Sequence, residues 1–200
     1  MPNLYPAFER QEVVVHSPRH VRTFAELNDA ELAGIATAWA IRRRTAATEG
    51  FTYVHALINE GRAAGSSLPH SHSQLVWLRE PPPEVERESE AGLAELRAET
   101  SLVVAREGSV WALVHPCGRL PYETLIVGDR FELGPALAVL RTVVRRLRAV
   151  EGPISWNAWL HEDHLELVPR LSVLAGVELG AGIYVNTVAP EDAAAALRDD

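Results

Sequence analysis

Two histidines and a glutamine stand at alternate positions of the segment LPHSHSQLVWL, as His70, His72 and Gln74. On a β-strand, such side chains share one face and lie about 6–7 Å apart. A neutral imidazole can accept a nucleotidyl group if its other ring nitrogen is held by an acceptor. Gln74 cannot protonate a leaving group, but its amide can donate hydrogen bonds to phosphate oxygens. The pattern favours phosphate chemistry with a good leaving group; a polar strand face without chemistry is the alternative.

A loop of small residues, from Asn59 to Pro69, precedes these histidines. Its glycines let backbone N–H groups approach a phosphate, and Ser66 or Ser67 can add hydroxyl donors. Such a loop is often only a connection. Its place directly before the histidines favours a phosphate-binding loop.

The elements that position these residues follow an order that occurs twice: strand, long helix, strand, turn, histidine-bearing strand. Asn28, with Glu31 three residues later, predicts a capped helix start. Two degenerate half-repeats, residues 1–100 and 101–200, would share one core. The expected strands are 11–16, 53–58, 70–78, 110–114, 124–127, 154–160, 165–168 and 182–186, and the expected helices are 28–44, 84–100, 134–150 and one from about 190 to 197.

The composition limits the classes of protein. Hydrophobic residues make up 47% of the 200 residues, enough for a real core, and the net charge of −8 argues against nucleic-acid or membrane-surface binding. A single cysteine, Cys117, excludes an intramolecular disulfide and a four-cysteine zinc cluster. Neither a signal sequence nor a membrane-spanning run stands out, so a cytoplasmic protein is expected.

The stretch NEGRAAGSSLPHSHSQ closely resembles the galactose-1-phosphate uridylyltransferase branch of the histidine-triad superfamily. Further similar stretches are NLYPAF, EVVVHSPRH, PPPEVERE, PYETLIV and a C-terminal segment that begins at HLELVPRL. That last segment is more similar to nucleotide-sugar phosphorylases than to the classical uridylyltransferases. The resemblance covers essentially the whole chain. It implies an α+β fold of tandem histidine-triad-like half-barrels, an antiparallel sheet with flanking helices.

The resemblance also implies roles for individual residues. His72 corresponds to the nucleophile that forms a nucleotidyl-histidine, and Gln74 to the residue that contacts the transferred phosphoryl group. Asn59, Gly65 and Ser67 correspond to positions that contact the nucleotide or its phosphates. Glu178 corresponds to a glutamate that binds the sugar.

Two family metal sites are implied, and both depart from the family pattern. In the first, His20 and His70 correspond to zinc ligands that normally join a Cys-x-x-Cys pair. This chain carries no such pair, which leaves two ligands, too few for a closed zinc site. A clipped first segment or a natural minimal variant would explain this. In the second, which suits zinc or iron, the matching residues are Glu88, His161, His164 and Glu166; ordinary polar loop residues are the alternative.

The expected function is nucleotidyl transfer or phosphorolysis by double displacement, with a nucleotide sugar and a sugar phosphate as partners. A homodimer is expected from the family. Two alternatives stay open: nucleotide binding without turnover, and hydrolysis of dinucleoside polyphosphates. Hydrolysis is the weaker, because Gln74 replaces the acid-capable third histidine of hydrolytic relatives.

Overall fold

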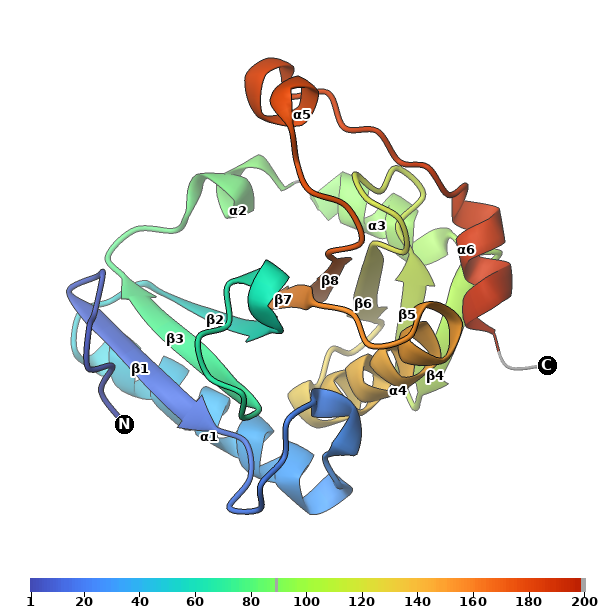
Figure 1. Ribbon diagram of the computed structural model, residues 1–200. Coiled ribbons are helices and arrows are strands. Elements are labelled where there is room, and N and C mark those ends of the chain that lie inside the picture. Colours follow the sequence, from blue (N-terminus) through green and yellow to red (C-terminus); the bar gives the residue numbers. More distant parts are fainter. Residues whose placement is uncertain (89, 199–200) are drawn as a thin grey trace.

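The computed structural model describes residues 1–88 and 90–198 of the chain (Figure 1). Strands and helices are interspersed along the sequence, and four of the described helical segments are only five or six residues long or form a single 3₁₀ turn. The elements are β1 (Arg10–Val15), η1 (Phe24–Glu26), α1 (Asp29–Thr48), β2 (Tyr53–Glu60), η2 (Arg62–Ala64), β3 (His72–Leu78), α2 (Pro83–Arg87), α3 (Glu90–Ala98), β4 (Val103–Glu107), β5 (Val110–Val114), β6 (Thr124–Gly128), α4 (Leu133–Glu151), β7 (Trp156–Leu160), β8 (Leu165–Pro169), α5 (Gly176–Ala181) and α6 (Pro190–Leu197).

Within the described residues, all the strands belong to one antiparallel sheet of eight, in the order β1-β3-β2-β7-β8-β6-β5-β4. The order is symmetric about the central pair, β2 and β7. Counted inward, β1-β3-β2 on one side corresponds to β6-β8-β7 on the other. A strand, a long helix and a hairpin make up each of these units. The predicted α+β fold, an antiparallel sheet with flanking helices, is confirmed, and strands from both halves of the chain join in the one sheet.

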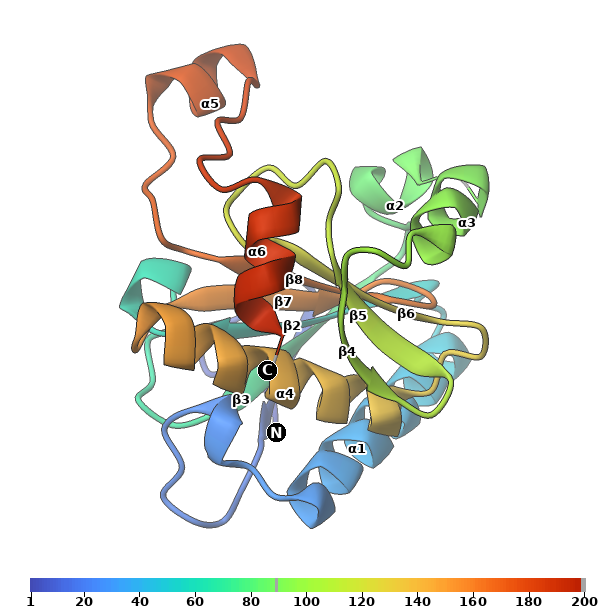
Figure 2. The same ribbon diagram turned by 90° about the vertical axis from the view of Figure 1, so that its right-hand side faces the viewer.

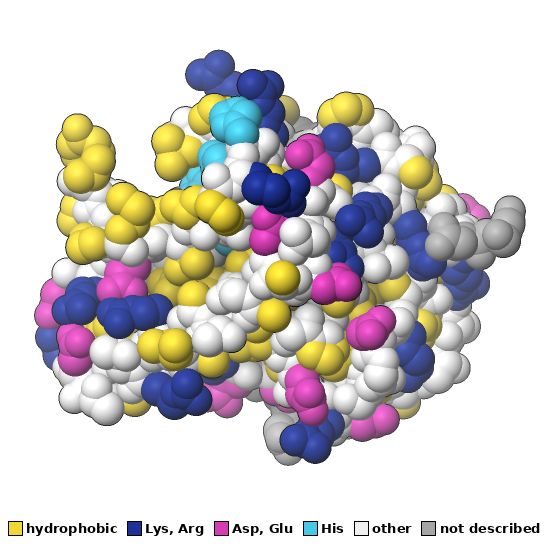
Figure 3. Space-filling view, turned by 90° about the horizontal axis from the view of Figure 1, so that it is seen from below, with side chains coloured by type: hydrophobic (Ala, Val, Ile, Leu, Met, Phe, Trp, Pro, Cys, Tyr) yellow, Lys and Arg dark blue, Asp and Glu magenta, His cyan; other side chains and the backbone are white. Residues whose placement is uncertain are grey.

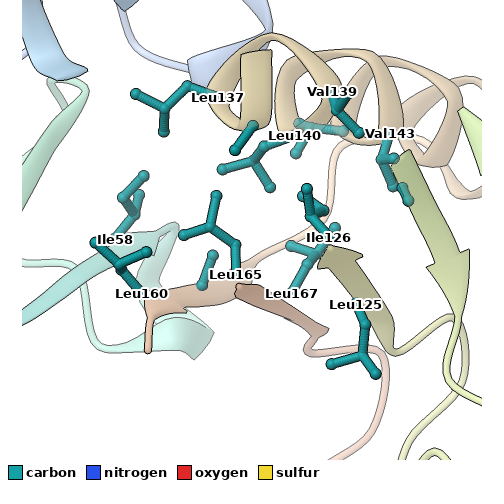
Figure 4. Close-up of a cluster of buried hydrophobic side chains, with 14 of the residues drawn as sticks. Ile58, Leu125, Ile126, Leu137, Val139, Leu140, Val143, Leu160, Leu165 and Leu167 are labelled. Carbon is teal, nitrogen blue, oxygen red and sulfur yellow. The ribbon is translucent and has the colours of Figure 1, made fainter. Parts of the chain in front are cut away.

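Helices α1 and α4 cover one face of the sheet, whereas α2, α3 and α5 lie toward the other side (Figures 1 and 2). Figure 4 shows Leu137 and Leu140 of α4 above Ile58, Leu160 and Leu165 of the sheet. All five side chains are at most 1% exposed. Because burial of one such side chain stabilises the fold by about 1.5–3 kcal/mol, this layer holds the two halves together.

Helix α1 begins as the sequence predicts. The side chain of Asn28 accepts a hydrogen bond from the backbone N–H of Glu31, and the carboxylate of Glu31 accepts one from the backbone N–H of Asn28. Further along, Nε1 of Trp39 donates to Oγ of Ser73 over 2.9 Å. This bond ties α1 to the back of the strand that carries His72 and Gln74.

Three sequence expectations about the elements were wrong. The single helix expected at 84–100 is two helices, because the chain is already extended at Glu88 (φ −68°, ψ 136°). The strand expected at 182–186 does not form. Gly182 ends α5 in the left-handed region, and the next residues pair with no described strand. The short strand β4 was missed. The other expected strands are present, with ends that shift by one or two residues.

Helix α5 and its flanking segments project away from the sheet (Figures 1 and 2). Val173 and Leu179 are 88% and 75% exposed there. No helix in the part of the chain that the structure describes combines the length and the apolar character needed to cross a bilayer.

Candidate functional site

The hairpin of β2 and β3, with the loop between them, surrounds a pocket of about 770 Å³. We call it the loop pocket. It is lined by residues 58–62 and 66–72, by Arg22, Thr23 and Glu26, and by Arg148 and Ile154. Seen from below, histidine side chains reach the surface next to basic side chains, all of which are arginine in this lysine-free chain (Figure 3). A concave site with convergent polar groups is where a small molecule is expected to bind.

His72 is the first residue of β3 and is 6% exposed. Its Nδ1 lies 2.8 Å from the carbonyl oxygen of His70. A carbonyl only accepts, so Nδ1 carries the proton and the neutral ring keeps its lone pair on Nε2. This is the arrangement that a nucleophilic imidazole requires.

Ser71 and Ser73 point to the opposite side of the strand, as alternation predicts. Oγ of Ser71 lies 2.8 Å from Nδ1 of the buried His16, and Ser73 accepts from Trp39. Burial lowers the pKa of His16 to about 3, so this ring is neutral near pH 7. The backbone around His72 is therefore held from behind by buried polar contacts.

Gln74 shares the face of β3 that carries His72. Its Oε1 accepts from Nε2 of Gln11 over 2.6 Å, so its own amide nitrogen is left to donate. His70 does not continue this pattern, because β3 begins at His72. Nδ1 and Nε2 of His70 lie 3.1 Å and 2.8 Å from the carbonyl oxygens of Ser71 and Arg19.

The loop residues divide into those that line the pocket and those that shape it. Asn59, Ser66 and Ser67 line it. Nδ2 of Asn157 donates to Oδ1 of Asn59, so the amide nitrogen of Asn59 can serve a ligand. Gly65 lies outside the lining, with φ +84° at the end of η2. Only glycine adopts this conformation without strain, so Gly65 contributes shape rather than contact.

Several lining residues were not anticipated from the sequence. Arg22, Arg62 and Arg148 reach the pocket from three separate segments, and only Arg62 lies within the loop that the sequence marks. Glu60 forms part of the wall and accepts from Oγ1 of Thr23, the N–H of Phe24 and Nε1 of Trp156. Burial raises its pKa, against the effect of these donors.

Gly61 is another loop residue that the sequence analysis did not single out. A Cβ there would lie 2.2 Å from Oγ of Ser155, and its φ is +83°. No other residue fits at this position, because both the space and the backbone conformation exclude a side chain.

A second cluster lies at the turn between β7 and β8. Glu88, His161 and His164 each place one potential ligand atom within 4.8 Å of the others. The two imidazoles stack with centroids 4.6 Å apart. Nδ1 of His161 is 2.6 Å from Oε1 of Glu88 without hydrogen-bond geometry, and neither ring nitrogen of His161 makes a hydrogen bond to a described residue.

The residues of this cluster fit a metal ion. Two buried ring nitrogens that make no hydrogen bond are costly unless something binds them. Burial lowers the pKa of His161 to about 3 and also lowers that of His164, so both rings are neutral ligands near pH 7. Burial also raises the pKa of Glu88 to about 7. Two histidines and a carboxylate are a donor set that proteins use for transition metals.

Glu166 stands apart from these three residues. One carboxylate oxygen pairs with Arg119, while the other lies 3.8 Å from Nε2 of His161. Arg119 also pairs with Glu123. Burial raises the pKa of Glu166 to about 8 although Arg119 opposes this.

The other predicted ligands are not gathered into a metal centre. The rings of His20 and His70 are 6.0 Å apart, and both nitrogens of His70 contact carbonyl oxygens. These residues do not fit a closed zinc site, and we derive no step through a metal there. Glu178 lies on α5, where it accepts from the N–H of Ala175, outside the lining of the loop pocket.

Comparisons with known proteins show what the chain is similar to. A family model described as galactose-1-phosphate uridyl transferase, N-terminal domain, matches residues 6–82. ADP-glucose phosphorylase from Arabidopsis thaliana is 26% identical over 231 aligned positions, 96% of this chain and 65% of that protein. Galactose-1-phosphate uridylyltransferase from Thermotoga maritima is 25% identical over 233 positions, 94% of this chain and 73% of that protein. This chain therefore spans less than two thirds of the plant relative.

A solved structure shares the fold. The crystal structure of an ADP-glucose phosphorylase from Arabidopsis thaliana with bound ADP-glucose aligns with a TM-score of 0.89 at 22% identity. The alignment covers 100% of this chain and 81% of that chain. The overall fold is thus common to both.

Proposed function

We propose that the chain, which is similar to a galactose-1-phosphate uridylyltransferase and an ADP-glucose phosphorylase, belongs to the galactose-1-phosphate uridylyltransferase-like branch of the histidine-triad superfamily. It would transfer a nucleoside monophosphate from a nucleotide sugar through His72. The acceptor is a second phosphate compound, either a sugar 1-phosphate or inorganic phosphate. The relatives named above carry out reactions of both kinds, to judge by their names.

In the first step, Nε2 of His72 attacks the α-phosphorus and the sugar 1-phosphate leaves. A bond from Nε2 to phosphorus forms as the phosphoanhydride bond breaks, and the leaving phosphate needs no proton. The contact from Nδ1 to the carbonyl of His70 supports this step, because it fixes the tautomer and stabilises the charge that develops on the ring. In the second step, an oxygen of the acceptor phosphate attacks the nucleotidyl-histidine and releases His72.

Donors around the loop pocket suit the charge that shifts onto the phosphate oxygens. The amide of Gln74, the hydroxyl of Ser67 and the guanidinium groups of Arg22 and Arg62 are the groups we assign to this task. Gln74 lies beside His72 on the strand rather than in the pocket lining. We therefore assign Gln74 to the phosphate that reacts with His72. The arginines, which line the pocket, would contact phosphate oxygens further from His72.

A metal ion, which we propose to be zinc or iron, would be held by Glu88, His161 and His164. Bound there, it would supply a positive charge, and its ligands would link the end of α2 to the turn between β7 and β8. No step of the transfer is assigned to it.

One observation carries the proposal. His72 lines the loop pocket together with Ser67 and Asn59, and only its Nδ1 is bonded to the backbone, so Nε2 is left for the reaction. The test is incubation with UDP-glucose or ADP-glucose labelled at the α-phosphate. An acid-labile label on the protein is expected, and His72→Ala should abolish it. His115→Ala removes a histidine outside both clusters and is the matched control.

Products separate this function from its alternatives. Release of glucose 1-phosphate with transfer of the nucleotidyl group to an added phosphate compound supports the proposal. Binding of the nucleotide sugar without label or product would contradict it, as would cleavage of a dinucleoside polyphosphate by water in place of transfer.

A further inference from the structure

A second pocket, of about 630 Å³, lies on the sheet face next to the Glu88 cluster. We call it the sheet-face pocket. The lining includes residues of α2 and its flanks, His55 and Trp159 of the sheet, and His161 directly after β7. Glu88, Arg119 and Glu166 complete the wall. None of these groups takes part in the transfer proposed above, so this pocket would bind a different ligand.

The cluster beside this pocket supplies three ligand atoms. Tetrahedral metals need a fourth ligand, and three-ligand sites keep that position for water or an exogenous molecule. Glu166 is the nearest further carboxylate, but Arg119 holds one of its oxygens. Since Glu88 and His161 themselves line the pocket, the fourth position of a metal bound here faces it.

The charged groups that line the sheet-face pocket indicate which kind of ligand would enter it. Three carboxylates, those of Glu84, Glu88 and Glu166, line the pocket together with two guanidinium groups, those of Arg87 and Arg119. A divalent cation would add two positive charges to this nearly balanced set of groups. An anion would therefore be attracted more strongly to the metal-loaded protein than to the metal-free one.

Arg119 supplies a specific partner for such an anion. Its Nε and Nη2 contact Glu123 and Glu166, and Nη1 makes no hydrogen bond to a described residue. The side chain of Arg119 is 39% exposed. The pocket is also far larger than the ~30 Å³ that one water molecule occupies.

We propose that a metal ion held by Glu88, His161 and His164 keeps one coordination position open to the sheet-face pocket, where a small oxyanion binds between the metal and Arg119. The ligand class is phosphate or carboxylate, either free or as part of a larger molecule. The inference is independent of nucleotidyl transfer at His72, because it concerns different residues and a different readout.

Cobalt provides the test, because the visible absorption of Co²⁺ reports its coordination. The full chain is loaded with Co²⁺, and the metal content is measured by mass spectrometry; one ion per chain is expected. Inorganic phosphate and acetate are then titrated in separate arms. The spectrum should change with saturation for at least one of them, while calorimetry should detect no binding of that anion to the metal-free protein.

Two variants assign the residues. Arg119→Gln should weaken anion binding at least about tenfold and leave the cobalt content unchanged. Arg106→Gln, which removes an equal charge from β4, is the matched control and should bind the anion as the wild type does. Thermal unfolding followed by circular dichroism establishes that each variant is folded. If Arg119→Gln does not fold, the titration of the wild type alone decides.

Glu166→Ala distinguishes an open site from a closed one. Retention of cobalt by this variant supports the proposal, since Glu166 is then not a ligand. Loss of cobalt in Glu166→Ala, a wild-type spectrum that neither anion changes, or failure of the wild type to bind cobalt would each overturn it.

Discussion

The hairpins β2–β3 and β7–β8 occupy equivalent places on the two sides of the sheet, yet their imidazoles have different surroundings. In the first, a backbone carbonyl takes Nδ1 of His72 and leaves one nitrogen for chemistry. In the second, neither nitrogen of His161 has a hydrogen-bond partner among the described residues, and a carboxylate and a second imidazole stand beside it. One backbone hydrogen bond is enough to separate a candidate nucleophile from a candidate metal ligand, because it decides how many lone pairs the ring can offer and where.

The largest expected effect tests whether the first hairpin carries the nucleophile and the second hairpin the metal ligands. His72→Ala should lower the rate of nucleotidyl transfer at least about 1,000-fold, because the covalent route is lost. His164→Ala should instead lower the metal content measured by mass spectrometry. If His164→Ala also abolished the label on His72, the two hairpins would not act separately.

Gln74 comes next. Gln74→Ala should reduce kcat about 100- to 1,000-fold, the usual cost of removing one donor to a developing oxyanion, with a smaller change in KM. Gln11→Ala, which removes the residue that orients Gln74, should have a smaller effect on kcat. Steady-state kinetics separate these outcomes; a raised KM with unchanged kcat would assign Gln74 to ground-state binding.

The buried His16 behind the first hairpin makes stability depend on pH. Its pKa is about 3 in the folded chain and near 6.5 in the unfolded chain, so the unfolded state binds the proton first as the pH falls. Stability from this residue is complete above about pH 6.5 and should decline by about 2–3 kcal/mol by pH 4.5. Urea unfolding over this range should show a shallower decline in His16→Phe. An unchanged decline would assign the effect to the buried histidines of the second hairpin.

The two long helices provide the smallest contrast. Asn28→Ala should lower the free energy of unfolding by about 1 kcal/mol, because the capping box of α1 is lost. Glu132→Ala should change it by less than about 0.5 kcal/mol, since Glu132 makes no side-chain cap to α4. Urea titrations of both variants give the comparison, and equal losses would contradict it.

The features that the sequence predicts well are those with a local cause. The capped start of α1 and the opposite directions of His72 and Ser73 follow from patterns a few residues long. The strand expected at 182–186 has the right residue types but no neighbouring strand to pair with. Arg22 and Arg148 reach the loop pocket from segments far apart in the chain, which no local pattern reveals. The roles of Asn59, Ser66, Ser67, Gly65 and Glu178 remain predictions.

The pairing of β2 with β7 joins residues 56–60 to residues 156–160, so the centre of the sheet depends on segments a hundred positions apart. On a ribosome that adds about 5–20 residues per second, β2 would wait roughly 5–20 s for its neighbour. During that time its hydrogen-bonding edge and the apolar underside of the first hairpin would both be uncovered. The nascent first half is therefore the stage of synthesis at which this chain would most need protection from aggregation.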